Sequence, residues 1–111
     1  MVDAVDAFFH GLERPLILWL ISQGPIHGYE LIKEVKRLTG QKLKPSNLYP
    51  LLYQLEDEGF VVGEWMKKGR RELRYYCLTE KGKNLLLRVR ELFSNPIRRV
   101  IADLLSEQKE N

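Results

Sequence analysis

The spacing of apolar residues changes at Phe60, and this change limits the folds open to the chain. Before Phe60, apolar residues recur with helical period, and after it they alternate as in a β-strand as far as Leu78. Three helices are therefore expected first, over residues 12–23, 28–38 and 45–59. A β-hairpin should follow, with strands over residues 60–66 and 72–78 and a turn centred on Gly69. Thr79 suits the N-cap of a fourth helix.

Prolines indicate where these helices begin or bend. Pro15 suits the first turn of the first helix, where its missing N–H has no helical partner to lose. Two starts of the third helix are open, since either Pro45 is its first residue or Ser46 is its N-cap, and Pro50 predicts a tight or distorted first turn. Further on, residues 94–96 (Ser-Asn-Pro) are expected to kink the last helix or to restart it, with the asparagine as a cap.

The order of the elements predicts the fold. Three helices, a hairpin and a long helix form the winged helix-turn-helix arrangement. We therefore predict an α+β fold, mainly α-helical, in which residues 1–78 are the winged helix-turn-helix DNA-binding domain and residues 79–111 a C-terminal dimerisation helix of the same compact unit. The recognition helix would span residues 45–58 and the wing residues 60–78.

Basic side chains gather in two short segments of the chain. Residues 33–48 hold five basic residues and one acidic residue, and residues 67–74 hold the same numbers. The remaining residues carry 8 of the 18 basic and 13 of the 15 acidic side chains, so the net charge of +3 averages two basic segments over an acidic remainder. The first segment leads into the predicted recognition helix and the second is the wing, which indicates a surface for a polyanion such as double-stranded DNA. On charge alone, two solvated faces are the alternative.

Two motifs in the chain are distinctive in combination, Asn47-Leu48-Tyr49-Pro50-Leu51-Leu52 and Tyr75-Tyr76-Cys77-Leu78-Thr79-Glu80-Lys81-Gly82. With them, the chain resembles the PadR-type winged-helix transcriptional regulators. The resemblance covers residues 12–105 and implies a cytoplasmic homodimer, usually a repressor, of the compact subgroup of that family. The chain departs from the family pattern at Ser46-Asn47, where Gly-Thr is common, and at Arg71, where proline is common. Both departures concern the operator sequence rather than the fold.

The residues expected to contact DNA lie on the third helix, away from its leucine stripe, and on the wing. They are Lys44, Ser46, Asn47, Tyr49, Tyr53, Lys67, Lys68, Arg70 and Arg71. Asn47 suits paired hydrogen bonds with adenine, although capping of the helix is the alternative for it and for Ser46. Tyr49 either packs against the wing or reaches a phosphate, and Tyr29 is interpreted as a packing residue. The lysines suit phosphates, and the wing arginines suit phosphates or a narrow minor groove.

An apolar stripe beyond residue 96 has no place in the core of a single winged helix. Together with Trp19 of the first helix, it predicts a contact with a second copy of the chain. The dimerisation residues are Trp19, Ile97, Val100, Ile101, Leu104 and Leu105. A twofold dimer would set two recognition helices about one DNA turn apart, roughly 34–36 Å, and so predicts a pseudo-palindromic operator. A small aromatic or hydrophobic effector that stacks on Trp19 at the dimer centre is a further partner that the sequence allows.

Other classes of protein find no support in the sequence. No nucleophile–base pair and no phosphate-binding glycine loop is present, so neither an enzyme nor a cofactor is expected. His10 and His27 are read as lacking a carboxylate or cysteine at ligand spacing, so no metal site is expected, and Cys77 is interpreted as a small buried hydrophobe.

The same residues bear on location and on the remaining alternative. Asp3 and Asp6 are the wrong charge for a secretory leader, and the longest apolar run, residues 16–21, is too short to cross a membrane. A cytoplasmic protein without membrane contact is therefore expected. A winged-helix protein–protein adaptor that does not bind DNA is the alternative to a DNA-binding regulator.

Overall fold

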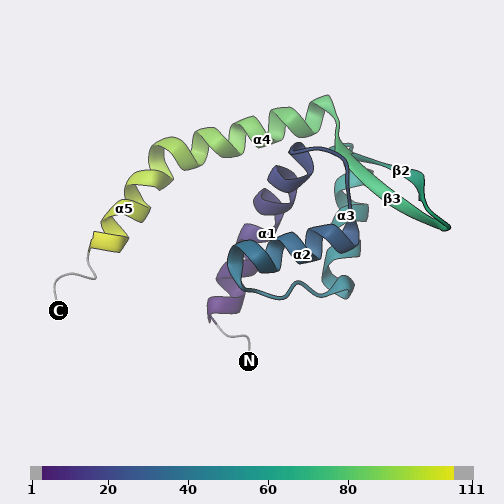
Figure 1. Ribbon diagram of the computed structural model, residues 1–111. Coiled ribbons are helices and arrows are strands. Elements are labelled where there is room, and N and C mark those ends of the chain that lie inside the picture. Colours follow the sequence, from purple (N-terminus) through teal and green to yellow (C-terminus); the bar gives the residue numbers. More distant parts are fainter. Residues whose placement is uncertain (1–3, 107–111) are drawn as a thin grey trace.

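The computed structural model describes the backbone of residues 4–106 and the side chains of residues 10–106. The ends of the two predicted ranges, at residues 1–3 and 107–111, lie outside the described residues. The elements are α1 (Ala4–Ser22), β1 (Ile26–His27), α2 (Gly28–Thr39), α3 (Pro45–Asp57), β2 (Val61–Lys68), β3 (Arg71–Leu78), α4 (Glu80–Leu92), a π-helical turn η1 (Phe93–Ile97) and α5 (Arg98–Ser106). Three helices pack beside a hairpin, and a long helical arm leads away from them (Figure 1). The predicted mainly helical winged-helix fold is confirmed.

The core lies where the first three helices meet the hairpin and α4. The leucine stripe predicted for α3 is buried, because residues three and four apart share one face of a helix. The buried apolar side chains are Ile17, Leu18, Leu20, Ile21, Leu31, Val35, Leu43, Leu48, Leu51, Leu52, Leu55, Val61, Tyr76 and Leu86. Burying one such leucine or isoleucine stabilises the fold by roughly 1.5–3 kcal/mol, so this cluster sets the positions of α3 and the wing.

Helix α1 starts at Ala4 rather than at Leu12. Pro15 therefore lies inside the helix, and its predicted place in the first turn was wrong. A proline within a helix removes the hydrogen bond that its own nitrogen would donate. After Pro15, the side chains of Ile17, Leu18 and Ile21 are buried in the core. Their packing stabilises the helix across Pro15.

Helix α3 settles the alternatives at its start. Lys44 is the N-cap and Pro45 the first helical residue, so Ser46 does not cap the helix. The helix continues without interruption through Pro50, and its first turn is tight, one of the two outcomes expected, since the Asn47 N–H donates to the Lys44 carbonyl three residues back at 2.9 Å. Pro50 and Ser46 are both exposed, so water can reach the Ser46 carbonyl that the missing N–H of Pro50 leaves without a helical partner.

The sheet has three strands, in the order β1-β3-β2, where sequence patterns predicted two. Strand β1 pairs antiparallel with β3 through Ile26 and His27, and two residues are too short to show an alternation. In the hairpin, Lys68 pairs with Arg71, so the turn is only two residues long. Gly69 has a positive φ of 65° and Arg70 does not, which matches a type II′ turn.

The hairpin turns one of its two faces toward the helices. That face carries Val61 and Tyr76, which are 2% and 1% exposed. Cys77 points to the opposite face and is only half-buried, so its interpretation as a buried hydrophobe was wrong. Because neighbouring strand residues alternate between faces, burying Tyr76 turns Cys77 away from the core.

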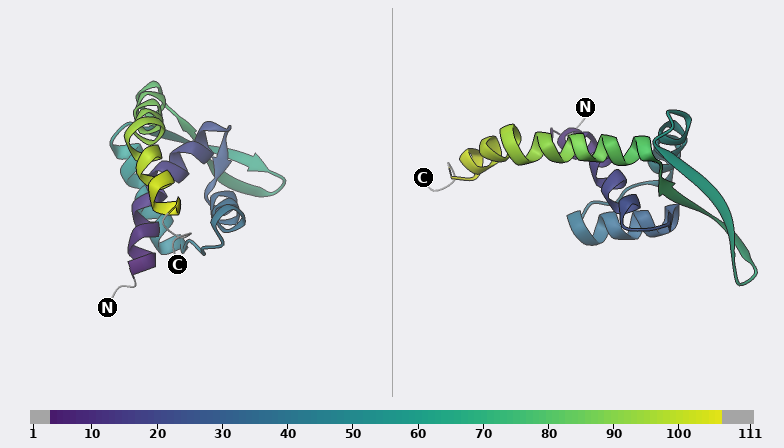
Figure 2. Two further views of the ribbon diagram at one scale, coloured as in Figure 1. Left: turned by 90° about the vertical axis from the view of Figure 1, so that its left-hand side faces the viewer. Right: turned by 90° about the horizontal axis from the view of Figure 1, so that it is seen from above.

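The C-terminal arm is one continuous run of helical residues. Thr79 caps α4 as predicted, since its hydroxyl oxygen accepts the N–H of Gly82 at 3.1 Å. Of the kink or restart expected at residues 94–96, the restart is absent, because Pro96 lies in η1 and the chain passes directly into α5; the arm instead bends between α4 and α5 (Figure 1). The wider π-helical turn shifts the hydrogen-bond pattern, which accommodates a residue that has no N–H to donate. The arm extends beyond the rest of the molecule (Figure 2), and the extents of the whole molecule, arm included, are 57 × 30 × 25 Å.

Candidate nucleic-acid interface

The outward side of α3 presents polar and aromatic side chains. Ser46, Asn47, Tyr49 and Tyr53 are all exposed, because the opposite side of the helix carries the leucine stripe. Tyr53 is the more open of the two tyrosines, at 60% exposure against 36% for Tyr49. Since the N-cap is Lys44, Ser46 and Asn47 do not serve as the cap, and their side chains lie at the N-terminal end of the exposed helix face.

Tyr49 lies against the start of α2. A Cβ atom added to Gly28 would be 2.7 Å from the Tyr49 hydroxyl oxygen, so the ring occupies the space that a side chain at Gly28 would fill. Close packing therefore explains the glycine at position 28. Tyr49 thus both packs between α2 and α3 and keeps part of its ring in solvent.

The wing carries four exposed cations at its tip. Lys67 and Lys68 end β2, Arg70 lies in the two-residue turn, and Arg71 begins β3. All residues from Met66 to Glu72 are exposed. The tip therefore projects from the core as a basic finger, with lysine and arginine side chains of the kind that contact phosphates.

Two hollows bring residues of different elements together. The larger, of about 710 Å³, is lined by His27, Tyr29, Tyr49, Lys68, Arg71 and Leu73. It joins the tyrosine of α3 to two wing cations, and it includes Tyr29, which the sequence pattern indicated as a packing residue but which is 66% exposed. The smaller, of about 180 Å³, places Lys44 and Asn47 beside Lys42 at the start of α3. Ser46, Tyr53, Lys67 and Arg70 line neither of these two hollows.

His27 caps the helix that supports this surface. Its Nδ1 accepts the N–H of Glu30 at 3.2 Å, and its Nε2 lies 3.0 Å from Oε1 of Glu30. The Tyr75 ring packs edge-on against the imidazole at 5.2 Å. The expectation that the histidines lack carboxylate partners was wrong, since Glu30 lies beside His27 and Glu13 beside His10. A residue three positions on meets an N-cap side chain, so spacing alone signalled this contact.

Arg74 differs from the other wing cations, because it pairs with an acid. Its Nη2 donates to Oε2 of Glu56 on α3 at 2.6 Å, and its guanidinium lies over the rings of Trp65 and Tyr76. Although desolvation opposes it, hydrogen bonding to Glu56 raises the pKa of Arg74 above its ordinary value. For the Tyr76 phenol, burial acts in the other direction and raises the pKa, so the ring stays neutral. Sequence reasoning counted Arg74 among the free cations and missed Glu56.

The division of charge on this surface assigns different tasks to its two parts. Helix α3 holds no lysine or arginine between Pro45 and Asp57, so its outward face offers an amide and hydroxyls, which suit base edges. The cations stand at its N-terminal boundary and on the wing, where they suit phosphates.

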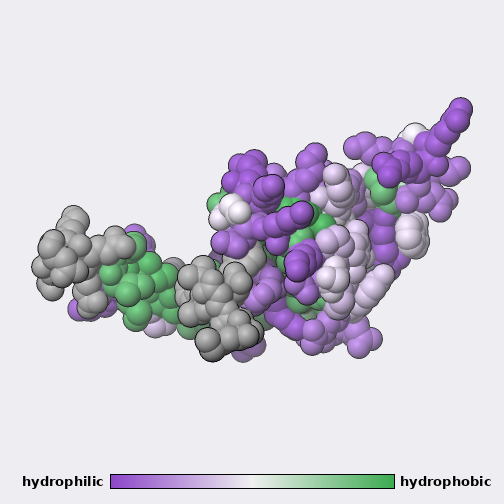
Figure 3. Space-filling model, turned by 90° about the horizontal axis from the view of Figure 1, so that it is seen from below, coloured by the Kyte–Doolittle hydropathy of each residue, from purple (hydrophilic) through white to green (hydrophobic). Residues whose placement is uncertain are grey.

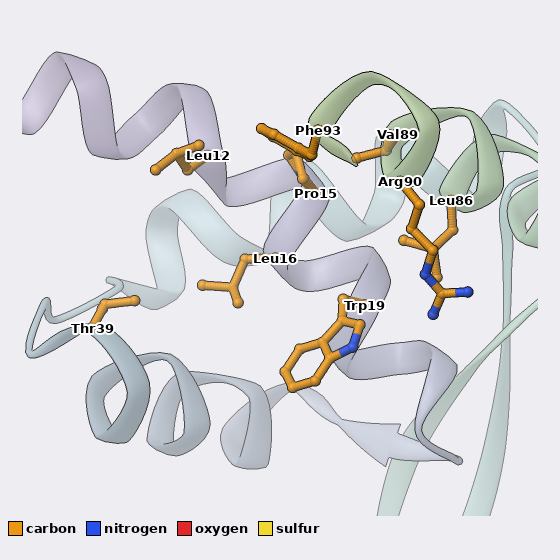
Figure 4. Close-up of a pocket in the computed structure, with 9 residues that line it drawn as sticks. All are labelled: Leu12, Pro15, Leu16, Trp19, Thr39, Leu86, Val89, Arg90 and Phe93. Carbon is orange, nitrogen blue, oxygen red and sulfur yellow. The ribbon is translucent and has the colours of Figure 1, made fainter. Parts of the chain in front are cut away.

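The predicted dimerisation residues lie on the C-terminal arm, except for Trp19, which lies on α1. Ile97 is half-buried, whereas the stripe on α5 is open to solvent, with Val100 65%, Ile101 45%, Leu104 63% and Leu105 57% exposed. Trp19 is 38% exposed and lines a groove of about 370 Å³ between α1 and α4. Figure 4 shows Trp19, Leu12 and Leu16 along one side of this groove and Val89 and Phe93 along the other.

Two further features of the described residues are negative. No three histidine, cysteine, aspartate or glutamate side chains converge there on a metal position. Within the same residues, no helix combines the length and the apolar character needed to cross a bilayer.

The sequence of the chain is similar to those of known transcriptional regulators. Residues 17–88 match the model of the Transcriptional regulator PadR-like family. The chain is 37% identical over 73 residues to the negative transcriptional regulator PadR of Bacillus subtilis, a match that covers 63% of this chain and 40% of that protein. It is 32% identical over 85 residues to a transcriptional regulator of Mycobacterium tuberculosis, over 77% of this chain and 78% of the relative.

Solved structures agree with these matches. A candidate transcriptional regulator of Thermoplasma acidophilum is 35% identical, with a TM-score of 0.73 over 91% of this chain and 95% of that one. Several curated relatives are much longer, and the chain spans 20% to 40% of their length.

Proposed function

Because the chain belongs to the PadR-like family of transcriptional regulators, we propose that it represses transcription as a homodimer bound to a pseudo-palindromic operator in double-stranded DNA. In this proposal residues 1–78 bind DNA and residues 79–111 dimerise, and the protein acts in the cytoplasm by binding rather than by catalysis. The repressor role is supported by the name of the Bacillus subtilis relative, a negative transcriptional regulator.

One observation carries the DNA-binding mode, the cleft in which Tyr49 of α3 meets Lys68 and Arg71 of the wing. Major-groove entry of α3 would set Asn47 and Ser46 at base edges, because they lie at its exposed N-terminal end. The wing would then lie along the neighbouring backbone, with Arg70 at its tip near phosphates or a minor groove.

The remaining candidate residues take positioning contacts in the same docked arrangement. Lys44, Lys67 and Lys68 reach phosphates, and the hydroxyls of Tyr49 and Tyr53 lie within the groove or beside its backbone. These contacts orient the chain on the duplex without reading its sequence.

The dimer is supported by the apolar surface that the arm leaves open. Figure 3 shows this surface as a green area on the arm. The groove between α1 and α4, which Trp19 lines, reaches the same arm at Phe93, the first residue of η1. We infer that a second copy of the chain covers both, through a twofold contact in which each arm packs against the partner's groove.

A small aromatic or hydrophobic effector is the further partner we propose. The groove beside Trp19 has about 370 Å³ and an almost wholly apolar lining, a size and character typical of small-molecule sites. With the partner's arm closing the groove, such a molecule would stack on Trp19 at the dimer centre and alter the spacing of the two recognition helices. Quenching of Trp19 fluorescence by an aromatic ligand, abolished in Trp19→Leu, tests this part.

Selection of bound fragments from a random DNA pool tests the function. The purified chain should enrich one pseudo-palindromic sequence, and its affinity should fall steeply with salt. If Lys44, Lys67, Lys68, Arg70 and Arg71 each neutralise a phosphate in both protomers, the slope of log K against log salt approaches about −9. A protein–protein adaptor would enrich no sequence and show weak binding with a flat salt dependence. Reporter expression from the selected operator, with and without the protein, distinguishes repression from activation.

A further inference from the structure

A partly buried ion pair joins the recognition helix to the wing. Glu56 lies in the last turn of α3 and Arg74 in the middle of β3, and the two side chains are only 28% and 27% exposed. Their 2.6 Å contact is therefore less screened by solvent than an exposed pair such as Glu34–Arg37, which joins neighbours of a single helix. The pair links two elements that are expected to bind the same DNA.

Gly63 leaves room for the Arg74 side chain of this ion pair. The Gly63 N–H donates to the same Glu56 oxygen at 3.3 Å. A Cβ atom on Gly63 would lie 2.5 Å from Nε of Arg74, so the guanidinium reaches Glu56 by crossing bare backbone. Gly63 has no positive φ, so space, rather than backbone conformation, requires glycine here.

Two aromatic rings hold the guanidinium from its other sides. The Trp65 ring centre lies 5.6 Å and the Tyr76 ring centre 5.9 Å from Arg74 Cζ, within the range of cation–π attraction. Tyr76 is fixed in the core and pairs with Ile26 of β1. Arg74 is therefore tied to the helix, to the core and to the wing strand together.

Beyond this point the wing has no buried residue to steady it. Every residue from Met66 to Glu72 is exposed, so the Glu56–Arg74 contact is placed at the base of the free part of the finger. From Arg74 to Arg70 the strand extends by roughly 13 Å at ~3.3 Å per residue. A tilt of about 15° at the base would then move the tip by roughly 3.4 Å, enough to break hydrogen bonds to a phosphate.

We propose that Glu56, Arg74 and Gly63 form a positioning device that sets the angle of the wing against α3, so that helix and wing reach one DNA site together. Arg74 acts through the wing and is not itself a phosphate contact. This inference rests on the proposed function, since it assumes that both elements touch the operator.

A double-mutant cycle on the operator tests the device. Gly63→Ala keeps every charge but displaces the guanidinium, and it should weaken operator binding by about tenfold, in line with coupling within one ion-pair network. Replacing Arg70 and Arg71 by alanine should then cost at least about threefold less affinity in the Gly63→Ala chain than in the unmodified chain, because a misplaced wing already binds the DNA less well. Circular dichroism verifies that each variant is folded.

Glu56→Gln repeats the cycle in case Gly63→Ala does not fold. Glu34→Gln is the matched control for Glu56→Gln. It also removes one acid from an ion pair, but the Glu34–Arg37 pair lies within one helix and joins no separate elements. This control should leave the operator affinity unchanged or slightly higher. The device is refuted if the two arginine substitutions cost the same factor in the modified and unmodified chains. If they cost nothing in the unmodified chain, wing contact with DNA fails, which is a failure of the proposed function, and the positioning role fails with it.

Discussion

Val100→Glu is expected to separate the two copies of the chain without unfolding either. Val100 is 65% exposed on α5, so a carboxylate there stays hydrated in a single copy. In the proposed dimer the same side chain is buried against the partner, and a buried unpaired carboxylate costs several kcal/mol. The substitution therefore acts on association and hardly at all on folding.

The magnitude follows from the exposure of the stripe. Val100, Ile101, Leu104 and Leu105 together leave the equivalent of about 2.3 apolar side chains in solvent. At ~2 kcal/mol for each buried side chain, covering them contributes about 4–5 kcal/mol per protomer. Two carboxylates at ~3 kcal/mol each remove about 6 kcal/mol, which weakens dimerisation by about four orders of magnitude.

Sedimentation equilibrium at micromolar concentration measures this change. The unmodified chain should report about twice its 13.1 kDa mass, and Val100→Glu about 13.1 kDa with unchanged helical circular dichroism. Val62→Glu is the control, since it places the same change on an exposed residue of β2, at the other end of the molecule from α5 (Figure 1), and should remain dimeric. A monomeric unmodified chain, or a dimer that Val100→Glu leaves intact, would show that the α5 stripe is not the dimer contact.

Three further outcomes are expected. Replacing Arg70 and Arg71 by alanine should weaken binding to all DNA sequences and reduce the salt slope by about 1 for each phosphate that the wing no longer neutralises, and an unchanged slope would exclude wing contact. Asn47→Ala should lower the binding free energy by roughly 1–3 kcal/mol on the operator but by little on random DNA. Thermal stability should not change, because Asn47 is not the cap, and equal losses of affinity on both DNAs would contradict base reading. Thr79→Ala should lower the free energy of unfolding by about 1–2 kcal/mol in urea titrations, since it removes the cap on Gly82 and a 2.6 Å hydrogen bond to the Gly59 carbonyl; an unchanged midpoint would show that water replaces both.

Most elements could be predicted because their signals are local. The leucine stripe of α3, the Thr79 cap and the turn at Gly69 depend on residues a few positions apart, and the structure has all three. The errors fell where a local signal was missing or was overridden. Strand β1 is too short to show a period, and Pro15 lies inside a helix that core packing sustains.

The candidate interface was predictable in its parts, while their arrangement was not. Residue types and charge identified Asn47 and the wing cations as candidates, because exposure on a helix face and a basic turn follow from sequence. The meeting of Tyr49 with Lys68 and Arg71 in one cleft beside Tyr29 depends on how α2, α3 and the hairpin pack. The sequence counted Arg74 only as one of the basic residues of the wing segment, and its acidic partner lies 18 residues away on another element.

The order of elements, the winged-helix fold, the basic wing and the apolar stripe on the arm all follow from the sequence, because periodicity and charge are properties of neighbouring residues. Which cations remain free, which glycines make room for a neighbour, and where the wing meets α3 became evident only in the folded chain. Those outcomes depend on contacts between residues far apart in the chain, such as Gly28 with Tyr49 and Gly63 with Arg74. Such contacts form only when the core has set the elements against one another, and no local pattern encodes their distance.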